Sequence, residues 1–129
     1  MNAKKKKEII LTTDNKIGKL EEVSAALKAA DINLTSICAY SMEEKAIFYI
    51  TVCGSEKATQ VLSGIGSVET KEVIVVEMPN EVGQLQSLAA KLKDASVDLT
   101  YIYGTTSGDG IARVVLSSSD NDKALEVIA

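Results

Sequence analysis

The sequence predicts an α+β fold of two tandem modules, each an antiparallel sheet that helices pack on one face. Two observations predict it. The segment Asn15–Leu20 recurs as Asn80–Leu85, 65 residues further on, and such self-similarity is typical of repeated units. Within each copy, runs rich in β-branched residues alternate with runs of helical periodicity. The chain has 129 residues, of which 46% are apolar, so two small cores can form.

The two copies stay in register through the helix and strand that follow. The matched pairs are Ala25 and Ala90, Leu27 and Leu92, Leu34 and Leu99, Thr35 and Thr100, and Ile37 and Ile102. The spacing later changes by one residue, as expected in surface loops. We therefore divide the chain into a first domain over residues 1–70 and a second over residues 71–129.

The first copy is predicted to follow the order β-α-β-β-α. Its helix is indicated by the spacing of Ile17, Leu20, Val23 and Leu27, and we expect Asn15 to cap it. The other predicted elements are strands at Glu8–Thr12, Leu34–Met42 and Ala46–Cys53, a helix at Ser55–Leu62, and a long strand at Val68–Met78 that closes this copy and opens the next.

The second copy repeats this order, with Asn80 as the expected cap. Its predicted elements are a strand at Val73–Glu77, a helix through Ala95, strands at Leu99–Thr105 and Ile111–Leu116 around a Gly-rich turn, and a helix over Asp120–Ala129. No residues remain for a final strand, so either the domain is trimmed or another chain supplies that strand. Residues 1–7, with the basic run Lys4–Lys7, are expected to form a flexible tail.

Alternation in the first hairpin predicts a sheet with two different faces. Ile37, Phe48, Ile50 and Val52 share the face that helices cover. The opposite face is also apolar, which a second sheet from the tandem copy or another subunit would explain. The residues of that opposite face are Cys38, Tyr40, Ile47 and Tyr49.

Composition excludes several classes of function. A net charge of −4 argues against nucleic-acid binding, which needs a basic surface. No run approaches about 20 apolar residues, as a membrane span would require, and no signal peptide is recognisable, so we expect a cytoplasmic protein. The chain has no His, and its two cysteines stand far apart. We therefore expect no metal site, no cofactor and no catalysis.

Four short segments resemble the ACT domain: Asn15-Lys16-Ile17-Gly18 and Asn80-Glu81-Val82-Gly83 before the first helix of each copy, and Ile32-Asn33-Leu34 and Val97-Asp98-Leu99 after it. The resemblance covers nearly the whole chain, twice. It implies two ferredoxin-like βαββαβ modules. It also implies that domains pair side by side into an eight-stranded sheet and bind free amino acids between them, at the loop before the first helix.

The ligand site implied by the resemblance can be assigned residue by residue. The first helical turn would receive the carboxylate, the loop glycines would allow close approach, and side-chain oxygens would accept from the ammonium. The implied ligand-binding residues are Asn15, Ile17, Gly18 and Asn33 in the first copy, and Asn80, Val82, Gly83 and Asp98 in the second. Alternatively, the asparagines are helix caps only and the glycines relieve crowding between helix and strand.

Two departures from the family pattern bear on the ligand. Ile17 and Val82 stand where the family often has Pro, and Asp31 and Ser96 stand where it often has Gly. An apolar ligand would favour a pocket lined by Ile17 or Val82, whereas a small polar one would favour the asparagines. The residues do not decide between the two.

The resemblance predicts a non-catalytic regulatory protein that senses a small amino acid and modulates a metabolic enzyme or transporter, as a homodimer. The alternative is a tandem ACT module that mediates assembly without a ligand. A phosphatase on the same fold would need an arginine in the first loop, and none is present there.

Overall fold

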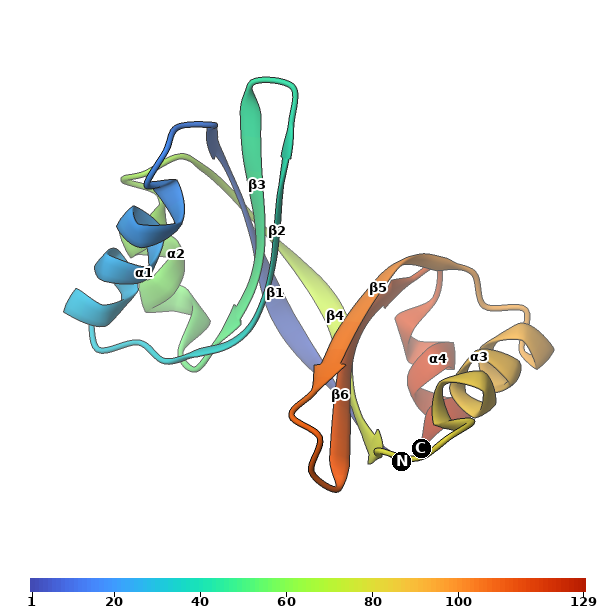
Figure 1. Cartoon of the computed structure of the whole chain (residues 1–129). Coiled ribbons are helices and arrows are strands. Elements are labelled where there is room, and N and C mark those ends of the chain that lie inside the picture. Colours follow the sequence, from blue (N-terminus) through green and yellow to red (C-terminus); the bar gives the residue numbers. More distant parts are fainter. The chain divides into compact units, whose positions relative to one another are not determined.

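The computed structural model describes residues 1–129 and contains six strands and four helices (Figure 1). The predicted order β-α-β-β-α occurs twice, and the α+β class is confirmed. The elements are β1 (Asn2–Asp14), α1 (Lys19–Ala29), β2 (Leu34–Met42), β3 (Lys45–Val52), α2 (Ser55–Leu62), β4 (Ser67–Pro79), α3 (Gln84–Asp94), β5 (Leu99–Thr106), β6 (Ile111–Ser118) and α4 (Asn121–Ile128).

The chain folds into two compact modules. The first module comprises residues 7–71, and the second comprises residues 1–6 together with residues 72–129. In the first module the strand order is β2-β3-β1-β4, and in the second it is β1-β4-β6-β5. Helices α1 and α2 cover one face of the first sheet, and α3 and α4 cover one face of the second (Figure 1). Each module is thus a ferredoxin-like βαββαβ unit.

The N-terminal segment is a strand, contrary to the expectation of a flexible tail over residues 1–7. Strand β1 begins at Asn2, and its first residues supply the last strand of the second module, which the sequence lacked after α4. Ala3 packs against the second core. The ammonium of Lys5 pairs with Asp122 on α4, and it lies 3.6 Å from the Glu72 carboxylate. Consecutive lysines concealed the strand because their side chains point alternately to opposite faces.

The core of the first module lies between its sheet and its two helices. Strand register pairs Ile9 with Ile50 and Leu11 with Phe48, and β2 places Ile37 opposite Ile50. The predicted assignment of residues to the two sheet faces is therefore confirmed. The buried members of this core are Ile9, Leu11, Val23, Leu27, Ile32, Ala46, Phe48, Ile50, Val52, Ala58 and Leu62.

The second module repeats this core with equivalent residues. Its buried members are Ile74, Val76, Met78, Leu88, Leu92, Val97, Val114, Leu116, Ala124 and Ile128. On the opposite face of the same sheet, Val73, Val75 and Val115 form a small buried cluster with Tyr101 and Tyr103 against it. Both faces of this sheet are therefore apolar near its centre.

The role of the N-terminal strand can be tested with two variants that add the same charge. Ala3→Asp places a carboxylate against the second core, and we expect it to lower the free energy of unfolding by about 1–3 kcal/mol. Asn2→Asp adds the charge at an exposed neighbouring position and should change stability by less than about 0.5 kcal/mol. Chemical denaturation measures both. Equal stability of the two variants would contradict a strand at residues 2–6.

Candidate functional site

The loops before α1 and α3 have the same unusual backbone. Gly18 and Gly83 occupy the N-cap positions with φ of 90°, and no side chain caps either helix. The expectation that Asn15 and Asn80 cap these helices is therefore wrong. Their backbone N–H groups instead donate to the hairpin turns: Asn15 to the Glu44 carbonyl at 3.0 Å, and Asn80 to the Gly110 carbonyl at 2.9 Å. Each asparagine thus directly follows its strand and lies beside the hairpin.

The two glycines are required by their backbone angle. A Cβ at Gly18 or Gly83 would have no atom within 4 Å, so neither relieves crowding between helix and strand. A φ of 90° is a conformation that glycine adopts with little cost and other residues avoid. The space above the first turn of each helix is therefore open, and the side chains of Ile17 and Val82 project from it fully exposed.

The structure does not bring all the expected ligand-binding residues together within a module. Asn33 follows α1, at the end opposite to Asn15, and Asp98 follows α3 in the same way. An 11-residue helix is about 16 Å long, so the two groups lie at opposite ends of the sheet. Asn33 lines a separate cavity of about 380 Å³ beside the end of α1. The carbonyl of Asp98 accepts from the Ser119 N–H at 2.8 Å.

A groove of about 350 Å³ opens beside the loop before α3. Of the expected site residues in the second module, Asn80 lines it, whereas Val82, Gly83 and Asp98 do not. The full lining is Met78, Pro79, Asn80, Glu81, Gln84, Leu85, Ile102, Tyr103, Gly104, Thr105, Thr106, Ala112 and Val114. We call this the Asn80 groove.

Sequence reasoning missed the contribution of strands β5 and β6 to the Asn80 groove. One signal was available: Gly104 is a glycine within a strand, which often marks a close approach between backbones. A Cβ there would lie 2.5 Å from a methyl group of Val114. The absent side chain at Gly104 therefore lets Val114 pack directly against this strand at the floor of the groove.

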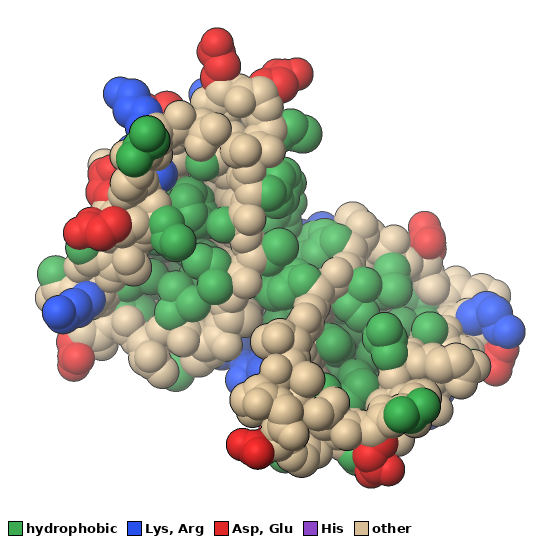
Figure 2. Space-filling model, viewed as in Figure 1, with side chains coloured by type: hydrophobic (Ala, Val, Ile, Leu, Met, Phe, Trp, Pro, Cys, Tyr) green, Lys and Arg blue, Asp and Glu red, His purple; other side chains and the backbone are tan.

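The Asn80 groove combines an apolar floor with a polar mouth. Met78 and Val114 are 4% and 9% exposed at its floor, and Asn80, Gln84 and Thr106 bring polar side chains to its edge. Glu81 is the charged residue of the lining. Hydrophobic side chains are visible between β5 and α3 in Figure 2. This pattern suits a small molecule with one apolar end and one polar end.

A family model described as an ACT domain pair matches residues 4–129. The chain belongs to the ACT domain pair family. A crystal structure of a protein from Bacteroides thetaiotaomicron is similar to this ACT pair, with a TM-score of 0.90, 29% identity, and coverage of 99% of this chain and 89% of the other.

Regulatory parts of aspartate kinases have the same fold. The regulatory subunit from Thermus thermophilus has a TM-score of 0.70 at 12% identity, with 99% of this chain and 95% of that chain covered. The Thermus flavus subunit has a TM-score of 0.64 at 13% identity, covering 98% and 93%. No curated protein matches the chain.

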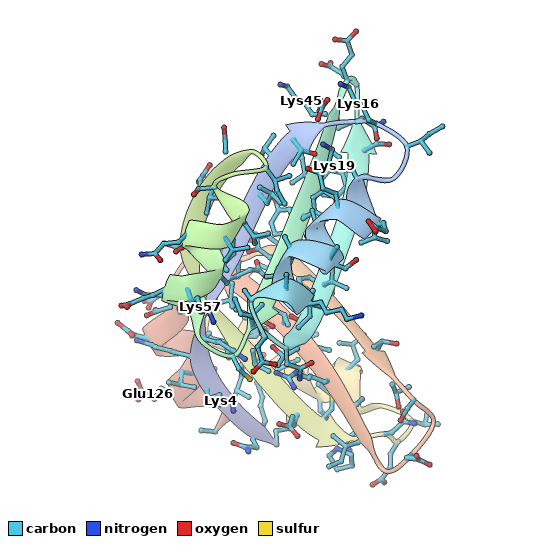
Figure 3. All side chains as sticks on the ribbon, turned by 90° about the vertical axis from the view of Figure 1, so that its left-hand side faces the viewer. Lys4, Lys16, Lys19, Lys45, Lys57 and Glu126 are labelled. Atoms are coloured by element: carbon cyan, nitrogen blue, oxygen red, sulfur yellow. The ribbon has the colours of Figure 1, made fainter.

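The equivalent place in the first module of this ACT pair is charged. Lys19 lies where the second module has Gln84; its ammonium is 3.1 Å from the Asp14 carboxylate and 3.0 Å from Glu22. Lys16 lies 3.2 Å from Asp14. Hydrogen bonds from Lys19 and then Lys16 lower the pKa of Asp14 below its usual value. Figure 3 shows Lys16, Lys19 and Lys45 at this same end of the module.

The structure groups no three Cys, Asp or Glu side chains in a way that could hold a metal ion. None of its helices has the length and apolar character that crossing a membrane requires.

The conformational role of the loop glycine is testable in the second module. Gly83→Ala forces a side chain into a left-handed backbone, and we expect a loss of about 1–2 kcal/mol in the free energy of unfolding. Gly110→Ala is the matched control, because Gly110 has open space and no positive φ. Urea denaturation should show the loss in Gly83→Ala alone; a comparable loss in both would contradict the assignment.

Proposed function

We propose that this ACT pair is a non-catalytic, cytoplasmic regulatory protein that binds a small amino acid and modulates a metabolic enzyme or transporter. The observation that carries the proposal is the Asn80 groove, a cavity of suitable size at the uncapped start of α3. Family membership supports a regulatory role, since ACT domains regulate rather than catalyse. Structural neighbours named as regulatory subunits of aspartate kinase share the fold.

The chemistry of the Asn80 groove fits both ends of an amino acid. The Gln84 N–H at the start of α3 donates to the Glu81 carbonyl at 3.3 Å. The next amides, of Leu85 and Gln86, have no acceptor within the helix, and together with the helix dipole they favour a carboxylate. The side-chain oxygen of Asn80 and the carboxylate of Glu81 are acceptors for the ammonium group. The apolar floor receives the side chain. The loop residues Val82 and Gly83 would then position the amides rather than line the groove.

The remaining expected residues need a second domain. Asn33 and Asp98 lie at the far ends of their modules, so they would contact a ligand only where another domain brings them to a loop. Asn15, Ile17 and Gly18 form the corresponding loop of the first module. Their roles in binding stay predictions.

We also propose that the protein is a homodimer in which a second copy covers the loop tips. Ile17 and Val82 are 108% and 105% exposed, and they occupy equivalent positions in the two modules. An isolated β-branched side chain held fully in water gains nothing from folding, whereas contact with another subunit would bury it. Side-by-side pairing is also what the family resemblance implies.

Ligand binding can be tested with the twenty amino acids in a thermal-shift series, confirmed by calorimetry. A ligand that binds only the folded state raises the melting temperature, so we expect at least one amino acid to do so. Asn80→Ala should weaken this binding about tenfold, through loss of a hydrogen bond to a charged group. Gln86→Ala, in the same helical turn but outside the groove, should leave it unchanged.

A failure of all twenty amino acids to bind would overturn the sensor proposal. A stable dimer that binds none of them would instead support the ligand-free assembly module.

Dimer formation can be tested by light scattering with size-exclusion chromatography. The double variant Ile17→Asp, Val82→Asp places charges at both loop tips, and we expect it to be monomeric at concentrations where the wild type is dimeric. Lys93→Asp, an exposed change at the other end of α3, should stay dimeric. A monomeric wild type, or a double variant that remains dimeric, would contradict this interface.

A further inference from the structure

The two modules have the same backbone at the groove but fill it differently. Strand register makes Phe48 the counterpart of Val114: Phe48 pairs with Leu11 and Ala39, and Val114 pairs with Val76 and Gly104. A phenyl ring in the first module thus replaces an isopropyl group. A methyl group, on Ala39, replaces the hydrogen of Gly104.

In the first module, side chains of the protein fill the position equivalent to the Asn80 groove. Phe48 is 3% exposed and belongs to the buried core. The side chain of Lys19 is only 13% exposed and lies between the Asp14 and Glu22 carboxylates. The phenyl ring fills the floor and the triad of charges lies above it, so the apolar surface that remains here is that of Leu20 and Ile37 at the edge, 57% and 39% exposed.

In the second module, the floor of the groove remains available. Val114 is smaller than Phe48, and a methyl group of Val114 packs against the backbone of Gly104. Neutral Gln84 stands where the first module has Lys19, and Pro79 stands where it has Asp14. The charge triad therefore has no equivalent here.

The lining also restricts the ligand's side chain. No Lys or Arg lines the Asn80 groove, so a second carboxylate on the ligand would find no cation. The apolar residues of the lining, among them Met78, Ala112 and Val114, offer no acceptor for a second ammonium group. Burying either charge without a partner is costly, whereas an apolar side chain would gain from leaving water.

We propose that the Asn80 groove is the single amino-acid site of the chain, and that it takes amino acids whose side chains are uncharged and apolar. This inference rests on the proposed function and adds the ligand class and the stoichiometry. Val114 determines specificity, because it is smaller than Phe48 and so leaves room for the ligand's side chain. The first module then stabilises the assembly without binding a ligand of its own.

Calorimetry on the full-length wild-type chain tests the ligand class and the stoichiometry. Leucine, valine and phenylalanine are titrated against aspartate, lysine and serine. We expect one ligand per chain and preference for the apolar group. A stoichiometry of two, or tighter binding of aspartate or lysine, would overturn the inference while leaving the sensor function intact. If none of the twenty amino acids binds, that result would instead contradict the proposed function itself.

Exchange of residues between the modules tests the location of the site. Val114→Phe places in the second module the phenyl ring that Phe48 provides in the first. It should weaken binding by about tenfold to a hundredfold, since the ligand's side chain loses its buried surface. Phe48→Leu alters the equivalent position of the first module and should leave affinity unchanged. The reverse pattern would place the site in the first module and overturn the inference.

A second pair of variants avoids the core altogether. Leu85 lines the groove and Leu20 is its counterpart in the first module; they are 58% and 57% exposed, so neither substitution should prevent folding. Leu85→Asp should weaken binding of an apolar amino acid at least about tenfold, and Leu20→Asp should not change it. Equal affinities for the two variants would overturn the inference even if Val114→Phe failed to fold.

Discussion

The structure depends on two long strands that each serve both modules. Strands β1 and β4 contain 13 residues apiece, about twice the usual length of a strand. The first part of β4 completes the first module and its second part opens the second, while the first residues of β1 complete the second module. A module of about 65 residues is only marginally stable by itself. The shared strands give each module four strands where the sequence of the second copy provides three.

This arrangement also explains the charge pattern of the N-terminus. A basic run next to a core would be unfavourable if every side chain faced the same way. Alternation sends Ala3 and Lys5 to the helix face, where Ala3 packs and Lys5 meets the carboxylate of Asp122. Hydrogen bonding to Asp122 raises the pKa of Lys5 above its usual value.

The two copies provide equivalent scaffolds, and their side chains differ at the place where a ligand would bind. The loop glycines, the strand-ending asparagines and the hairpin contacts are equivalent in the two modules. At the groove, however, Phe48 and Lys19 in one module stand against Val114 and Gln84 in the other. The fold therefore provides the position of a site, and these few side chains determine whether a ligand can occupy it.

Local sequence patterns predicted the elements of the fold, because helical and strand periodicities depend on near neighbours. These patterns did not predict features that depend on the backbone conformation of another residue or on contacts between separate segments. The capping role expected of Asn15 was wrong because Gly18, three residues later, takes a left-handed conformation and starts the helix. The family resemblance assigns Asn33 to the same site as Asn15, but the two residues lie at opposite ends of α1 and so cannot meet within one module. The strand residues of the Asn80 groove follow from hairpin register, which no local motif specifies.

The most direct test of the account is to map amide chemical shifts of the isotopically labelled chain during titration with an amino acid that binds. We expect shifts concentrated at residues 78–85 and 102–106, with residues 13–20 and 37–41 little affected. Equal shifts in both modules, or shifts confined to the first, would contradict it.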